Sequence, residues 1–245
     1  MKDLSSTSKA FITLVVAAGA AVLVDALLHW RPANLAAFVA LLTLSVVASR
    51  MRVKLPGVTG VMSMNLPFIL VAVAEVSTPE ALLIGCISTV VQSLPQGGRQ
   101  FNFIRVLFNF SNMALAVSAT RLLYTSEALA STLKSHPLLM AVAAAGFFAV
   151  NSIPVAIIIA LTEKRNAIRA WTAMFQLSYP YFLASAAIAG VVLTISGQAG
   201  WQVPVVLLPL MLGVFYSYRH YFGVIRAQAE MKRAPQPAAV ATVAS

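Results

Sequence analysis

The sequence predicts an all-α fold, a polytopic transmembrane helical bundle of about eight spans. Hydrophobic residues make up 60% of the 245 residues and charged residues only 10%, whereas soluble domains hold about 45–50% and about 25%. Apolar stretches follow one another almost without interruption from Ala10 to Tyr218. Lys and Arg cluster in every other gap between these stretches, which is a charge pattern typical of membrane proteins.

The apolar segments have lengths close to the roughly 17–25 residues that a membrane helix needs. Two of them, 59–75 and 80–96, are short and carry polar residues, so the alternative is six spans plus a broken or re-entrant pair buried against protein. We expect residues 1–222 to form the membrane domain and 223–245 a basic cytoplasmic tail, disordered toward its end. The eight segments are 10–29, 33–49, 59–75, 80–96, 106–124, 138–161, 175–196 and 203–218.

The segments between these spans carry turn signals or polar residues. The first apolar run has about 20 residues, which exceeds the 7–15 residues of a signal peptide, and we therefore interpret it as a membrane helix. The outer loop 125–137 is long enough for a short surface helix, and the basic loop 163–171 is expected to lie at the membrane interface. The other turns are marked by Arg31-Pro32, Pro56-Gly57, Val76 to Pro79 and Gly97-Gly98.

The basic residues predict the orientation. With eight spans, one side of the membrane holds 14 of the 17 Lys and Arg residues and the other side holds 3. Because positive charge concentrates in the cytoplasmic loops, both termini are expected in the cytoplasm of a bacterial cell, with the chain in its cytoplasmic (inner) membrane. The lipid bilayer accounts for the net charge of +10. Nucleic acid is not expected as a partner, because the chain lacks a basic and aromatic binding platform.

A polar stripe in segment 106–124 and the turn before it is the first candidate site. Its members recur every three or four residues, so they share one helix face, and Gln92 lies on a matching face of segment 80–96. Polar groups in a membrane usually face the bundle interior. The stripe either lines a cavity for a small-molecule ligand or ion, or forms hydrogen bonds between helices. The candidate ligand-binding residues are Gln92, Asn102, Arg105, Asn109, Asn112 and Asn151, the last in segment 138–161.

A second candidate set lies at the predicted outer edge. Asp25 and His29 are four residues apart and share a helix face, Glu75 ends segment 59–75, and Arg121 lies near the outer end of segment 106–124. Histidine titrates near physiological pH, so these residues form a candidate outward-facing proton or ligand sensor. The alternative is ordinary solvation at the interface, with a carboxylate of this set extended toward water or paired with Arg121.

Motifs for catalysis or metal binding are absent from the sequence. It has no glycine-rich phosphate loop, no paired metal-ligand motif and no nucleophile with a spaced base. The three histidines, His29, His136 and His220, lie in different segments. We therefore expect no enzymatic activity, no cofactor and no metal site.

Residues 50–70, RMRVKLPGVTGVMSMNLPFIL, carry a family resemblance, together with Glu75, Gln92, Phe108-Asn109 and the closing Tyr216-Ser217-Tyr218-Arg219. Over residues 35–230 the chain resembles the N-terminal integral-membrane sensor module of bacterial cyclic-di-GMP signalling proteins. In these proteins the last span leads into an HD-GYP or GGDEF output domain. Neither motif follows Arg226 here, so the resemblance implies a sensing module without its catalytic output domain.

Two functions from different classes follow from these observations. The first is a non-enzymatic membrane sensor that signals to a cytoplasmic output domain or to a partner chain. The alternative is a small-solute transport protein, such as a substrate-binding membrane subunit of a vitamin uptake system. In either case, small-residue faces such as the one containing Ala143, Ala144 and Gly146 are suited to oligomer formation.

Overall fold

Helices make up almost all of the structure. The computed structural model describes residues 5–31, 34–54, 61–95, 101–163, 166–199 and 203–233. The predicted all-α class is confirmed, with the addition of a hairpin of two three-residue strands. In chain order the elements are α1 (Ser6–Leu28), α2 (Leu35–Arg50), β1 (Arg52–Lys54), β2 (Val61–Ser63), α3 (Leu66–Glu75), α4 (Thr78–Ser93), α5 (Phe103–Tyr124), α6 (Glu127–Leu133), α7 (His136–Glu163), α8 (Ala167–Ala199) and α9 (Val203–Arg233).

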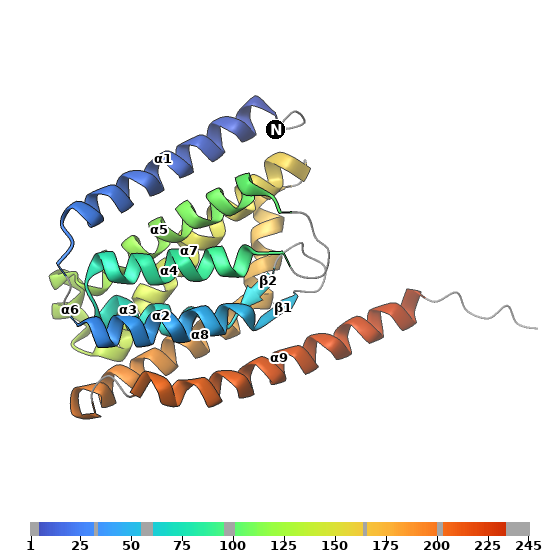
Figure 1. Ribbon diagram of the computed structural model, residues 1–245. Helices are drawn as coiled ribbons and strands as arrows, with labels where there is room; N and C mark the ends of the chain where they lie inside the picture. Colours follow the sequence, from blue (N-terminus) through green and yellow to red (C-terminus); the bar gives the residue numbers. More distant parts are fainter. Residues whose placement is uncertain are drawn as a thin grey trace, which may run out of the picture.

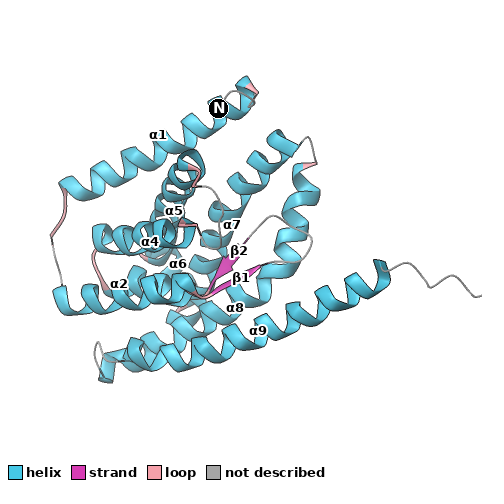
Figure 2. Ribbon diagram, turned by 45° about the vertical axis from the view of Figure 1, so that its right-hand side comes forward, coloured by secondary structure: helices cyan, strands magenta, loops and turns pink. Residues whose placement is uncertain are grey.

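The helices lie side by side and run back and forth along one direction (Figure 1). α7 packs on both α5 and α8, α5 also packs on α1 and α4, and α4 packs on α2. α1 and α9 lie at opposite edges of the bundle, as Figures 1 and 2 both show. The N-terminal end of α1 and the C-terminal end of α9 point to the same end of the bundle (Figure 1).

The core of the bundle surrounds α3. Every residue from Leu66 to Val73 is buried, and α3 contacts α2, α4, α5 and α8. A helix that is apolar on all sides must be covered on all sides, and these four neighbours provide that cover. α3 is therefore the central element on which the surrounding helices pack.

The predicted segment 59–75 is not one continuous helix. It begins as β2, which pairs antiparallel with β1 so that Val53 lies opposite Met62, and the helix starts only at Leu66. Ten residues of α-helix are about 15 Å long, half of a hydrocarbon core of about 30 Å. Of the predicted broken pair, only this segment is interrupted, because α4 is a continuous helix of 16 residues.

Some helices extend beyond the boundaries of their apolar segments. α8 begins at Ala167, eight residues before the predicted 175, because the Asn166 side chain accepts hydrogen bonds from the amides of Ile168 and Arg169 at 2.9 and 3.2 Å. α9 continues past 222, the predicted end of the membrane domain, to Arg233. The short helix expected in the loop 125–137 is confirmed as α6.

Four of the described helices are long and apolar enough to cross a membrane, namely α1, α5, α7 and α8, the last over Ala167–Ile195. α2 and α3 are apolar but shorter. The longest of the four, α7 and α8, each contain an internal proline, Pro154 and Pro180. Length and composition therefore support membrane association directly for these four helices.

Candidate functional site

The end of β2 and the two residues before α3, Ser63 to Asn65, form a buried segment at the centre of the bundle, referred to below as the break. Ser63 and Asn65 are both 95% buried, and Met64 between them is completely buried. Pro67 occupies the first turn of α3, where the missing amide N–H leaves no extra unsatisfied donor. The break is therefore a helix start built into the middle of the protein.

Side chains of the break connect the strand to α4. The Ser63 hydroxyl donates to the Asn65 side-chain oxygen at 2.7 Å, and the Asn65 amide donates to the Ser88 hydroxyl at 3.0 Å. Ser88 in turn donates to the Gly85 carbonyl at 2.9 Å. Buried polar groups are costly without partners, so this chain of bonds fixes the position of the break against α4.

The first amide of α3 is bound from α8. The Leu66 N–H donates to the hydroxyl of Tyr181 at 3.1 Å, although the two residues are 115 positions apart. The Asn65 side chain makes no cap bond to this helix, so a distant tyrosine fulfils the capping role that a neighbouring residue usually has. Tyr181 is only 2% exposed, which makes the contact part of the protein interior.

Two further hydroxyl groups are buried on the helices that flank α3. Ser45 on α2 and Thr89 on α4 are buried, and neither hydroxyl has a hydrogen-bond partner among the described residues. The polar groups of Ser45, Thr89 and the break are thus neutral hydroxyls and amides that both donate and accept. Such groups suit a water molecule or a neutral polar ligand better than a metal ion, and no three His, Cys, Asp or Glu side chains gather anywhere in the described ranges.

Arginines hold the C-terminal end of α4 against the hairpin. The Arg52 guanidinium donates to the carbonyls of Val91 and Leu94 at 3.0 and 3.1 Å, and Arg50 donates to Val91 at 3.4 Å. The last carbonyls of a helix lack intrahelical partners and carry partial negative charge. These basic residues therefore act as a C-terminal cap in addition to any role in orientation.

The structure divides the predicted polar stripe of α5 among different environments. Asn102 is the N-cap and accepts from the Arg105 amide at 3.1 Å, the Arg105 side chain is exposed, and Asn109 is half-buried. Asn112 is buried, and its amide donates to the Asn151 carbonyl and side-chain oxygen at 2.8 and 3.3 Å. Asn112 therefore connects α5 to α7, while Asn102 and Arg105 lie at the N-terminal end of the helix.

The face that α4 turns toward α5 is mostly small and apolar. Gly85 lies against Val117 and Met113 of α5, and the Cys86 thiol donates to the Phe110 carbonyl at 3.6 Å. Gln92 is half-buried near the C-terminal end of α4. The two helices pack side by side, with their contact at small residues that permit close approach.

The outer-edge residues separate into two groups. Asp25 and His29 form an exposed ion pair at 3.5 Å, and His29 also bonds to the Asp25 carbonyl at 2.8 Å. Arg121 lies elsewhere and donates to the carbonyl of Val73, in the last turn of α3. Tyr124 lies within electrostatic range of both Glu75 and Arg121. Asp25 therefore contacts His29, while Glu75 and Arg121 both lie near Tyr124.

The sequence-based candidates did not include the residues at the centre of the break. Ser63 and Asn65 belong to neither candidate set, and the same is true of Ser88 and Tyr181, whose side chains bond to this segment or to the start of α3. One local signal was present, because Asn65 stands two residues before Pro67, as an N-cap stands before a proline in the first turn. Nothing local indicates that Tyr181 reaches Leu66, since that contact depends on how α8 packs on α3.

Comparison with known proteins gives one match. The MASE9 family model matches residues 6–220, which is most of the chain. Neither the curated proteins nor the solved structures contain a match.

Proposed function

The chain belongs to the MASE9 family, whose domains are membrane-associated sensor modules, and on this basis we propose that it is a non-enzymatic sensor of the bacterial cytoplasmic membrane. The position of α9 is the observation that suggests a mechanism for such a sensor. α9 packs on α2, α8 and β1, and its C-terminal part projects beyond the rest of the bundle (Figures 1 and 2). A change inside the bundle can therefore move a rigid helix that extends out of it.

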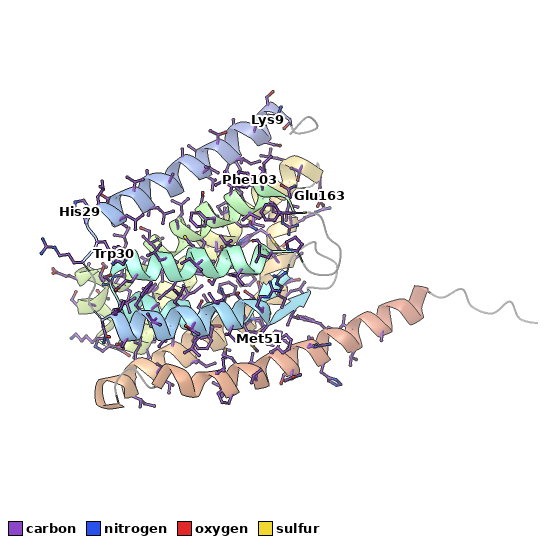
Figure 3. All side chains as sticks on the ribbon, in the orientation of Figure 1. Lys9, His29, Trp30, Met51, Phe103 and Glu163 are labelled. Carbon is purple, nitrogen blue, oxygen red and sulfur yellow. The ribbon has the colours of Figure 1, made fainter. Side chains whose placement is uncertain are left out.

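In this proposal the chain crosses the membrane eight times, with a discontinuous third crossing made of β2 and α3. Irregular backbone at membrane depth is tolerated where protein surrounds it, and α3 is surrounded by four helices. Lys9, Phe103 and Glu163 lie toward one end of the bundle, while His29 and Trp30 lie toward the other (Figure 3). This arrangement is consistent with both termini in the cytoplasm.

The output is proposed to be a cytoplasmic domain or partner chain of a cyclic-di-GMP pathway. The support is the resemblance of residues 35–230 to sensor modules that precede HD-GYP and GGDEF domains. α9 remains helical through Arg233, and a helix transmits rotation and translation along its axis because its backbone bonds are internal. The signal enters from the outer face or from within the bilayer.

A fusion experiment tests this proposal. A diguanylate cyclase domain joined after Arg233 should show activity that depends on growth conditions. Inserting two residues between Tyr221 and the cyclase should change that activity by rotating the output about 200°, whereas seven residues should preserve it because they make nearly two turns. Constant activity in every condition, unaffected by Asp25→Ala, Glu75→Ala or Arg121→Ala, would contradict the sensor function.

Small-solute transport is the second candidate, and the break is the observation that favours it. Transporters often bind their substrates at discontinuous helices near the middle of the membrane. The solute would then contact the break and the amides of Asn109 and Asn112, as in a substrate-binding subunit of a vitamin uptake system. Uptake should fall in Asn65→Ala, Asn109→Ala and Asn112→Ala variants, and unchanged uptake in all three would remove this candidate.

A further inference from the structure

Tyr181 of α8 contacts both the start of α3 and α9. Its hydroxyl accepts the first amide of α3 at 3.1 Å. Its ring meets Tyr218 of α9 edge to face, with centroids 6.3 Å apart and planes at 79°. A single buried side chain thus connects the start of the half-helix to the helix that leaves the bundle.

The attachment of α9 to the bundle is narrow. Among the described side chains of α9, only Met211 and Phe222 are buried. Tyr218, which contacts the Tyr181 ring, packs on Phe222 with ring centroids 5.7 Å apart. Other apolar side chains of α9 pack on the core while only partly buried, namely Leu208, Val214, Phe215 and Ile225. Elements with few fully buried apolar contacts move at lower cost, and α9 has two such residues among its described side chains.

The hydroxyl bond connects the Tyr181 ring to the first amide of α3. The Leu66 amide is an N-terminal donor that the helix itself cannot satisfy, and Asn65 does not cap it. An unsatisfied donor in a low-dielectric interior is unfavourable. If α3 shifts, the hydroxyl must either follow the amide or lose the bond, and both outcomes change how the ring meets Tyr218.

We propose that Tyr181 is a latch between the break and α9. With the Leu66 bond formed, the Tyr181 ring supports Tyr218 and Phe222 and holds α9 on the bundle. With the bond broken, that support is lost and α9 is released. The proposal builds on the sensor function and assigns to Tyr181 the step that transfers a change at α3 to the exit helix.

Hydrogen–deuterium exchange on the full chain in lipid nanodiscs tests the latch. Tyr181→Phe keeps the ring and removes the hydroxyl. We expect amides 64–69 to exchange at least about tenfold faster, as loss of a buried hydrogen bond predicts, and amides 211–222 of α9 to accelerate as well. The matched control is Tyr179→Phe, two residues away, because Tyr179 stacks on Phe175 and its ring is exposed.

A second variant tests the latch if Tyr181→Phe folds poorly. Tyr218→Leu removes the ring contact and leaves the Leu66 bond in place, so α9 should exchange faster while amides 64–69 stay protected. If Tyr181→Phe speeds amide exchange only in residues 64–69, the latch is wrong and Tyr181 serves only as a cap of α3. The two proposals can fail separately. If the cyclase activity of the fusion is constant but Tyr181→Phe still speeds exchange in both 64–69 and 211–222, the sensor function is refuted and the latch is not.

Discussion

At the scale of single residues, a few polar side chains connect neighbouring helices, while many buried hydroxyls, such as those of Thr120 and Ser185, bond to their own helix. Asn112 joins α5 to α7 through Asn151, and Trp171 of α8 donates to Ser152 of α7 at 2.9 Å. Both bonds are partly buried between neighbouring helices. Such bonds contribute modestly, because polar groups in a membrane also find partners in the unfolded state.

Replacing Asn112 distinguishes a structural role from ligand binding. Asn112→Ala should lower the free energy of unfolding by about 0.6–1.7 kcal/mol, the range measured for hydrogen bonds between membrane helices. The measurement is unfolding in a denaturing detergent, with Asn109→Ala on the same helix as the control. A variant of unchanged stability that loses uptake of a solute would instead support the transport function.

Arg52 gives a second prediction at this scale. Arg52→Ala should expose the last turn of α4 to faster amide exchange, because two carbonyls lose a charged donor, and should reduce stability by about 1 kcal/mol. Arg50→Ala should have less effect, since its single bond to Val91 is longer, at 3.4 Å. Equal effects of the two substitutions would indicate that the positive charge near α4 stabilises the protein, and that the hydrogen bonds of Arg52 to the end of α4 do not.

At the scale of elements, close contacts between helices depend on small residues at particular positions. α1 crosses α5 at Gly19, where an added Cβ would lie 2.6 Å from both the Cβ and the carbonyl oxygen of Ser111. Backbone atoms cannot rotate away as a flexible side chain can. The absence of a side chain at Gly19 therefore sets the distance between the two helices.

Gly19→Val should separate α1 from α5. The expected destabilisation is about 1–3 kcal/mol, as for overpacked interiors, and it should appear as a lower Tm of the purified protein in detergent. Ala20→Val, one residue further on the exposed side of α1, introduces the same side chain and should leave the Tm unchanged. A similar decrease of the Tm in both variants would show that the β-branched side chain in α1 causes it, and that the contact of Gly19 with Ser111 does not.

At the scale of the whole molecule, the prediction concerns orientation. Introduced cysteines can report it because the only native thiol, Cys86, is buried. In a Cys86→Ala background, His29→Cys should react with a membrane-impermeant maleimide on right-side-out spheroplasts. Phe103→Cys, at the opposite end of the bundle (Figure 3), should react only after lysis. The reverse pattern would place the termini outside.

The sequence predicts the features that depend on local interactions and not those that depend on contacts between distant segments. Helix positions from Ala10 onward, and the short α6 helix, follow from local composition, and so does the all-α class. A broken segment 59–75 was one of two alternatives, but the position of the break did not follow from the sequence. The apolar residues of this segment match both a strand and a buried helix, and periodicity cannot separate the two in a short segment. The polar stripe was visible as a spacing, yet Asn112 pairs with α7 and Arg105 is exposed because α5 has several neighbours.

The sequence by itself determined that this is an apolar, helical, membrane-associated chain with a strongly uneven charge distribution, because the hydrophobic effect and the positive-inside rule act through composition and short segments. Only the tertiary structure decided which residues meet. The contacts of Leu66 with Tyr181 and of Tyr181 with Tyr218 join residues on three separate helices. Those contacts depend on how the helices pack around α3, which no local pattern in the chain encodes.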